Sequence, residues 1–321
     1  MTGFLRKLSP ACFLFLFAPI TAEYLSGSSP SFNPIIFLVN LLLYGPGVLM
    51  IRELKVKWHK GWLAVFIMSA AYMIAEEGLM LNTLFDPFKN TAGRSLGVNW
   101  VWTTGMLLVH SLVSVFLPIL LAEALYSGRA RHQWIRSRTF FVLLAVFCGN
   151  VFGLGRLVAP ANRPGIIFYL VELAVIVACV VAAKHAPGPR SGNAEFNCLR
   201  SPRWLYFASL IGTTITFIVG FAAPSLPMPA LAKMALMAAV YLAFLEFLRR
   251  NHVFNPGLPP LAQLAIAAGI VSFWILVTPL TMIGKGNPGP LIFALLTIAF
   301  FLKTRRRLMS LEPARPGALR D

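Results

Sequence analysis

Two adjacent glutamates and one histidine lie inside strongly apolar stretches of this 321-residue chain. Glu76 and Glu77 fall near the end of an apolar run over residues 61–81, and His110 lies within the run over residues 101–126. An ionisable group in membrane hydrocarbon costs at least ~2.5 kcal/mol, so it usually faces a cavity or a polar partner. A carboxylate beside an imidazole can take a proton from water and stabilise developing charge. These three residues are therefore the candidate catalytic residues.

Three further polar residues are candidates for binding a substrate or an ion. Glu23 ends the first apolar run, Asn150 lies in the middle of the fifth, and Glu172 lies in the sixth. At a rise of about 1.5 Å per residue, the acids and His110 all fall in the outer half of the membrane. Because each would lose several kcal/mol facing lipid, we expect them to form one polar cluster. The alternatives are a glutamate pair hydrated just beyond the hydrocarbon and a histidine that makes an ordinary interhelical hydrogen bond.

Local sequence also predicts how this site is shaped. Neighbouring residues point about 100° apart on an α-helix, so one glutamate of the pair should face a cavity while the other points sideways. The run Tyr44-Gly45-Pro46-Gly47 predicts a kink or break in the second span. The outer loop over residues 82–99 contains Phe85-Asp86-Pro87-Phe88 and could cover the cavity, or simply lie at the surface.

Composition decides the class of protein. Hydrophobic residues make up 58% of the chain, charged residues only 12%, and the mean hydropathy is +0.74, whereas a soluble globular protein is about 25% charged. We therefore expect an all-α, polytopic transmembrane bundle that forms a single integral membrane domain over residues 1–321. The ten predicted spans are residues 8–24, 33–51, 61–81, 101–126, 139–157, 165–183, 205–222, 228–248, 261–280 and 289–302.

The basic residues predict the orientation of these spans. The net charge is +17, and most of the 28 lysines and arginines fall on alternate loops, which predicts that both termini are cytoplasmic. The tail over residues 304–321 is then a basic cytoplasmic segment. Arg52 and Glu53 mark the inner interface after the second span, where Glu123 can pair with basic loops. A cleaved signal peptide over the first run is the alternative, but its removal would invert this charge pattern.

The expected setting is a bacterial inner membrane, with the lipid bilayer and an unidentified small molecule, ion or peptide as partners. Nucleic acid is not expected, because the positive charge lies on short loops at one membrane face. Residues 1–184 carry most of the embedded polar groups, whereas residues 204–303 are mostly apolar. The four cysteines lack metal-ligand spacing, so we expect no metal on them, no cofactor and no disulfide framework. Whether a metal binds at Glu76, Glu77 and His110 stays open on the sequence alone.

Several short motifs in roughly the first 125 residues resemble a family of uncharacterised bacterial polytopic integral membrane proteins. That resemblance implies an integral membrane protein and assigns no reaction. The motifs are Pro19 with Glu23-Tyr24-Leu25-Ser26-Gly27, Tyr44-Gly45-Pro46-Gly47 with Arg52-Glu53, Glu76-Glu77-Gly78-Leu79 with Phe85-Asp86-Pro87, and Gly97-Val98-Asn99-Trp100 with His110-Ser111, Pro118 and Glu123.

The glutamate pair also resembles the first motif of the CAAX-processing and bacteriocin-processing intramembrane endopeptidases. In that family, paired glutamates activate water together with histidines on neighbouring helices, which implies catalytic roles for Glu76, Glu77 and His110. The family motif is Glu-Glu-x-x-x-Arg, but Leu81 occupies the arginine position here. The family also uses two embedded histidines, and this sequence offers one.

Three functions remain open on the sequence alone. Ten spans would suit a transporter made of two inverted five-helix repeats, as in the drug/metabolite transporter superfamily, with the acids binding protons or cations. A membrane hydrolase would use one glutamate as general base, with His110 and Asn150 orienting groups or stabilising charge. A structural or assembly protein would explain without chemistry why the embedded acids lie in the first six spans.

Overall fold

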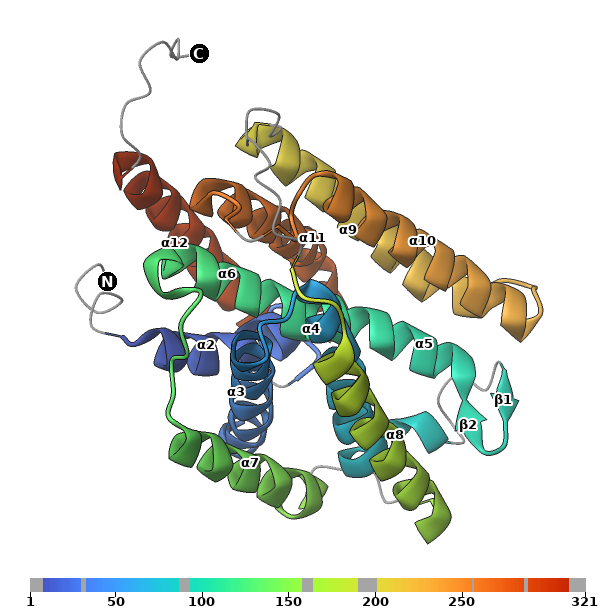
Figure 1. Ribbon diagram of the computed structural model, residues 1–321. Coiled ribbons are helices and arrows are strands. Elements are labelled where there is room, and N and C mark those ends of the chain that lie inside the picture. Colours follow the sequence, from blue (N-terminus) through green and yellow to red (C-terminus); the bar gives the residue numbers. More distant parts are fainter. Residues whose placement is uncertain are drawn as a thin grey trace.

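The computed structural model describes residues 8–29, 33–86, 93–157, 164–189, 201–255, 257–285 and 288–311. These residues form a bundle of ten helical segments, which confirms the all-α membrane fold expected from the sequence (Figure 1). Eight of the segments are long and apolar enough to span a membrane. The first segment, Pro10–Tyr24, is shorter, and the last, Gly289–Leu311, contains a run of basic residues in its second half and is not among the eight.

The ten segments follow one another along the chain, and a small antiparallel hairpin precedes the fourth. The first six are α2 (Pro10–Pro19) with η1 (Ile20–Tyr24), α3 (Pro34–Lys57), α4 (Trp62–Met73) with η2 (Ile74–Met80), α5 (Trp100–Val109) with η4 (His110–Phe116) and α6 (Leu117–Leu125), α7 (Ser137–Phe152), and α8 (Ile166–His185). The last four are α9 (Pro202–Ala222), α10 (Ala230–Arg250), α11 (Pro260–Lys285) and α12 (Gly289–Leu311). Turns η3 (Thr83–Phe85), η5 (Ser127–Arg129), η6 (Leu154–Leu157) and η8 (Ala223–Ser225) and strands β1 (Arg94–Ser95) and β2 (Val98–Asn99) complete the described elements.

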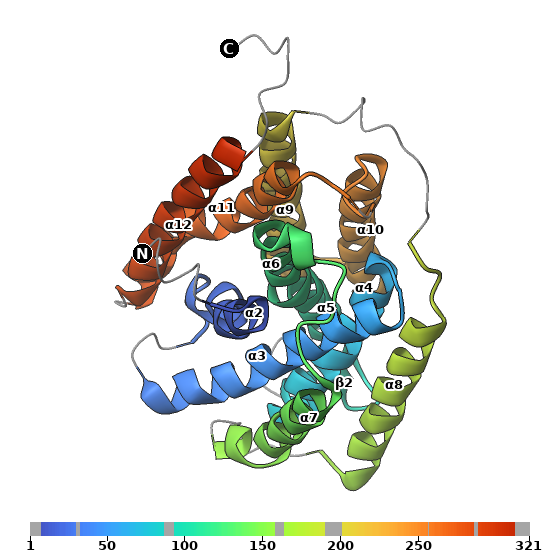
Figure 2. The same ribbon diagram turned by 60° about the vertical axis from the view of Figure 1, so that its left-hand side comes forward.

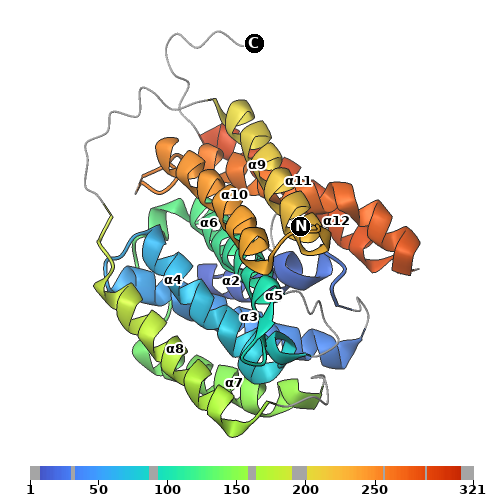
Figure 3. The same cartoon turned by 90° about the vertical axis from the view of Figure 1, so that its right-hand side faces the viewer.

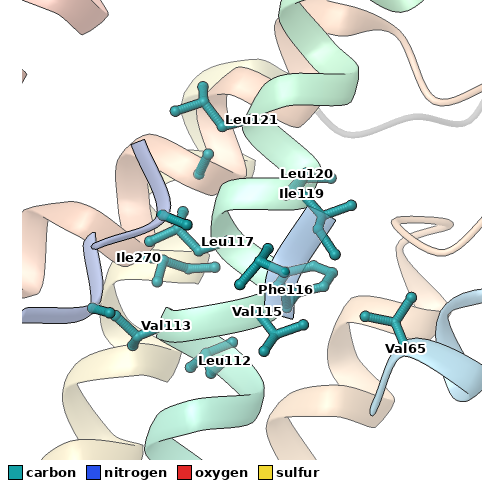
Figure 4. Close-up of a cluster of buried hydrophobic side chains, with 14 of the residues drawn as sticks. Val65, Leu112, Val113, Val115, Phe116, Leu117, Ile119, Leu120, Leu121 and Ile270 are labelled. Atoms are coloured by element: carbon teal, nitrogen blue, oxygen red, sulfur yellow. The ribbon is translucent and has the colours of Figure 1, made fainter. Parts of the chain in front are cut away.

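The continuous helix α5–η4–α6 runs through the middle of the molecule. Helices α2, α3 and α4 contact it from one side, and α9, α10 and α11 contact it from the other (Figures 2 and 3). The buried cluster in Figure 4 joins Leu112 and Phe116 of this helix to Val65 of α4 and Ile270 of α11. Helices α7 and α8 lie at the periphery, and only 17% and 11% of the residues in their apolar stretches are buried. Their outward apolar side chains are therefore available to lipid.

Helix α3 continues through Pro46, so the break that was one form of the prediction at residues 44–47 is wrong, and the kink stays a prediction. The apolar residues on both sides of Pro46 pack against neighbouring helices, and this packing holds the helix together without the missing backbone donor. The glycines instead permit close packing. A Cβ atom at Gly47 would collide with the ring of Tyr72 and would lie 3.1 Å from the ring of Phe147.

Contacts between helix ends place the predicted inner segments on one face of the bundle. Lys55, near the end of α3, pairs with Glu123 near the end of α6, and Lys60, before α4, donates to the carbonyl of Ala186 after α8. Tyr126, after α6, donates to the carbonyl of Leu8 before α2. The alternation expected from the basic residues thus matches the packing of the first six segments. The assignment of this face to the cytoplasm stays a prediction.

Candidate functional site

Three wide helical turns carry the embedded acids and the histidine. Turns η1, η2 and η4 are π-helical, and they hold Glu23, the Glu76–Glu77 pair and His110 respectively. Their backbone bonds span five residues, for example from the N–H of Leu81 to the carbonyl of Glu76 at 2.8 Å. In the described parts of the chain these are the three π-helical segments, and each contributes to one site. Such turns are frequent at functional sites because they redirect side chains.

The two glutamates meet on opposite sides of the imidazole of His110. Nε2 of His110 lies 3.2 Å from Oε1 of Glu77, and Nδ1 lies 3.4 Å from Oε2 of Glu76. The Ser114 hydroxyl lies 3.2 Å from Nδ1. All four side chains are buried. Both glutamates therefore face the same group, contrary to the divergence expected of an α-helix, and both lie in a π-helical turn.

A hydrogen-bonded chain extends this group to Glu23. The hydroxyl of Tyr44 donates to Oε1 of Glu23 at 2.6 Å and also contacts Oε1 of Glu76. Ser29 donates to Oε2 of Glu23 at 2.6 Å, and Asn40 donates to Ser29 at 2.9 Å. One phenol carries one proton, so Tyr44 can donate to only one of its two carboxylates at a time.

The charge of this group is not balanced by its own members. Three carboxylates, those of Glu23, Glu76 and Glu77, share one imidazole, so at least one carboxylate has no cationic partner within the group even when His110 is protonated. Isolated buried carboxylates are costly, so protons or a bound cation must supply the missing positive charge. Chemically, the group is suited to accept protons or to hold a cation.

A cavity of about 570 Å³ lies against this Glu/His cluster. Glu23, Glu76, Glu77, His110 and Ser114 form its polar side. The remaining wall is mainly apolar and comes from distant segments, with side chains that include Trp102, Met106, Phe217, Phe221, Met237 and Trp274. The sequence did not predict the part of this wall that comes from α9, α10 and α11, because apolar residues on those spans look like any other lipid-facing residue.

The loop after η2 also contributes to the site. The Thr83 hydroxyl bonds the carboxylate of Glu77 and lines the cavity. Trp102 on α5 donates to the same hydroxyl at 3.4 Å. Residues 87–92 of the predicted cover lie outside the described residues, and the hairpin at residues 94–99 is not part of the described cavity wall. Thr83 was missed because a threonine in a polar loop carries no distinctive signal.

The other two predicted site residues lie elsewhere. Asn150 donates to the carbonyl of Val39 at 2.9 Å and so joins α7 to α3. Glu172 is buried between α8 and η2, where the missing Cβ of Gly78 makes room for its carboxylate. Neither oxygen of Glu172 has a hydrogen-bond partner among the described residues. The structure thus brings together Glu23, both glutamates of the pair and His110, but leaves Asn150 and Glu172 outside that cluster.

The same residues provide a possible metal site. Glu76, Glu77 and His110 each offer one ligand atom, and these atoms lie within 4.8 Å of one another. Three nitrogen and oxygen ligands with an open fourth position are typical of catalytic zinc sites. The sequence left open whether a metal binds to this group, because its members come from two segments that only the fold brings together.

The fold and the cluster define a multi-pass α-helical membrane protein with a cluster of buried polar side chains beside a cavity. A family model described as an uncharacterized membrane protein family matches residues 12–310, so the chain belongs to that family. This confirms the resemblance drawn from the motifs of the first 125 residues and extends it over nearly the whole chain. No curated protein and no solved structure matches the chain.

Proposed function

We propose that this protein is a membrane-embedded hydrolase that acts on an amphiphilic substrate. The observation that carries the proposal is the convergence of Glu76, Glu77 and His110 beside a cavity of about 570 Å³. A paired carboxylate and imidazole next to open space can bind and activate a water molecule. The mixed character of the wall supports an amphiphile, with its reactive polar group at the cluster and its apolar part along α9 and α11.

The hydrogen bonds favour different roles for the two glutamates. Glu77 is held by Thr83 and lies against His110, so it orients the imidazole. Oε2 of Glu76 has no hydrogen-bond partner among the described residues and lies 3.4 Å from Nδ1 of His110. Glu76 is therefore the general base in this proposal, and His110 stabilises the negative charge that develops on the substrate. A divalent cation held by the same residues would polarise the attacking water.

Proton-coupled transport is the second candidate, and one observation favours it. The chain Ser29–Glu23–Tyr44–Glu76 links several proton-accepting groups within hydrogen-bonding distance. The distribution of acids argues against a transporter built from two inverted repeats. The embedded acids lie in the first six segments, and Glu246 is the one acid in α9–α12. Glu246 is bound to Arg249 and Arg250 at the surface.

Comparison of product profiles tests hydrolysis. Membranes from cells producing the wild type, Glu76→Gln or His110→Asn are profiled for peptides and lipids, with Glu246→Gln as the matched control. We expect a set of cleavage products that is present with the wild type and Glu246→Gln and absent with the two site variants. Identical profiles for the wild type and folded Glu76→Gln would overturn the hydrolase.

A second measurement separates transport from hydrolysis. The wild type in proteoliposomes with an internal pH dye would acidify the lumen down an imposed proton gradient only if it carries protons. Proton flux that Glu76→Gln abolishes, together with unchanged product profiles, would favour the transporter.

A further inference from the structure

A second large cavity lies at the inner end of the molecule, away from the Glu/His cluster. Its volume is about 510 Å³, and its walls are the first turns of α9 and α11 and the last turns of α12. Arg203 of α9 and Arg305 of α12 lie at its inner end. The remaining wall is largely apolar. We call this cavity the inner groove.

The inner groove is open toward the side of the bundle. Phe207 and Leu302 line it and are 58% and 54% exposed, so they face the region where lipid chains lie. Leu264, Val271 and Phe301 are buried and form its floor. The groove therefore offers an apolar surface that starts at the inner interface and runs toward the middle of the membrane.

The polar side chains in the wall beyond the arginines bond each other and do not require a polar ligand. The hydroxyls of Tyr206 and Ser272, which both line the groove, lie 3.0 Å apart and bond each other. A hydrocarbon chain would therefore fit the part of the groove beyond the arginines, because these two hydroxyls already bond each other and need no partner on the ligand.

The charge at the inner end has one sign. The sequences of α9, α11 and α12 contain no aspartate or glutamate, whereas Arg203 and Arg305 lie at the groove and Arg306 and Arg307 follow on α12. Guanidinium groups bind phosphate oxygens in a bidentate manner, and basic pockets between membrane helices bind anionic head groups on the cytoplasmic side.

We propose that the inner groove binds one anionic phospholipid, with its phosphate at Arg203 and Arg305 and an acyl chain along α11. This site is independent of the Glu/His cluster and of the hydrolase proposed for it. It differs from general lipid contact because it combines two arginines with an apolar groove whose walls come from three helices.

Native mass spectrometry of the full chain in detergent tests the proposal, with dioleoyl phosphatidylglycerol and dioleoyl phosphatidylcholine as probes. The wild type should retain one phosphatidylglycerol in preference to phosphatidylcholine. The double variant Arg203→Gln/Arg305→Gln should weaken that binding about 30-fold, which corresponds to about 1 kcal/mol for each arginine. Arg306→Gln/Arg307→Gln is the matched control, since it removes the same charge from residues that do not line the groove, and it should bind nearly as the wild type does.

Ala268→Leu tests the acyl part of the site, because this half-buried residue lines the groove and a larger side chain would narrow it. We expect weaker phosphatidylglycerol retention with both arginines intact. Equal retention of the two lipids by the wild type, or equal losses in the two double arginine variants, would overturn the proposal. Full displacement by inorganic phosphate would also overturn it, as would a dimer that Ala268→Leu dissociates, because a second copy would then occupy the groove.

Discussion

Two buried groups of charged residues lie at different levels of the bundle, and they differ in charge balance and in free space. We call them the inner and outer clusters after the orientation that the basic residues predict. At the inner end, Arg52 and Lys55 face Glu53 and Glu123, so two cations meet two anions. At the outer end, three carboxylates share one imidazole. The inner cluster adjoins a cavity of about 60 Å³, and the outer Glu/His cluster adjoins one of about 570 Å³.

In the inner cluster, the guanidinium of Arg52 contacts several partners that leave little free space around it. Arg52 is fully buried and donates to Glu53 at 2.6 Å and to the carbonyls of Ala130 and His132. Its guanidinium also lies 3.5 Å from the ring centroid of Trp134. Such a group fastens α3 to the segment after α6 and has little room for a ligand. Balanced charge without space indicates a structural role, whereas excess negative charge beside space indicates a binding or catalytic role.

Breaking the inner cluster should have the largest effect. Arg52→Gln leaves Glu53 buried without its cation, and removal of one partner from a buried ion pair costs about 3–5 kcal/mol. We expect a large loss of folded protein, seen by fluorescence-detected size-exclusion chromatography after heating. The exposed residue Arg138 provides the control, as Arg138→Gln should remain near the wild type. Equal thermal midpoints for the two variants would remove the structural role assigned to Arg52.

Added zinc tests the charge deficit of the outer cluster. If Glu76, Glu77 and His110 hold a divalent cation, zinc at one hundred times its dissociation constant should stabilise the fold by about 2.7 kcal/mol. The measurement is the thermal midpoint of the purified protein with and without zinc. His110→Ala should abolish the increase, while Glu246→Gln should retain it. An increase of the same size in His110→Ala would place the zinc elsewhere.

A glutamate-to-glutamine substitution should lower stability in the inner cluster but not in the outer cluster. Glu123→Gln removes the partner of Lys55 and Arg52 and should lower the free energy of unfolding by about 1–3 kcal/mol. Glu76→Gln relieves negative charge and should leave stability unchanged or raised, as is common for residues retained for activity. Thermal midpoints of the two variants check this comparison. Destabilisation of similar size in both would show that the two clusters are equally structural.

Substitution of Asn150 should have the smallest effect on stability and should leave the functional site unchanged. Asn150→Ala removes one hydrogen bond to the Val39 carbonyl and should cost about 1 kcal/mol. Product profiles and the zinc response should not change, because the residue is not among those lining the outer cavity. Loss of either response in a folded Asn150→Ala protein would extend the functional site to α7.

The sequence predicted part of the candidate site well and part of it poorly. Glu23 and His110 were correctly expected to meet the glutamate pair, because ionisable residues at similar depth avoid lipid by converging. Glu172 has the same depth but lies on the other side of η2, against Gly78. Arg52 was interpreted as a residue of the interface, yet its side chain is fully buried. The sequence predicted where each residue lies along its helix, but it did not predict the direction in which the side chain points.

By itself, the sequence determined the class of protein, the approximate positions of the ten helical segments and the place of each polar residue along its own helix. These follow from local hydrophobicity and from a nearly constant rise of about 1.5 Å per residue. Only the tertiary structure decided which polar residues meet, that π-helical turns present both Glu76 and Glu77 to His110, and that α9, α10 and α11 enclose the cavity. The reason is that lateral position and rotation of a helix depend on packing between residues far apart in the chain, and no local pattern encodes that packing.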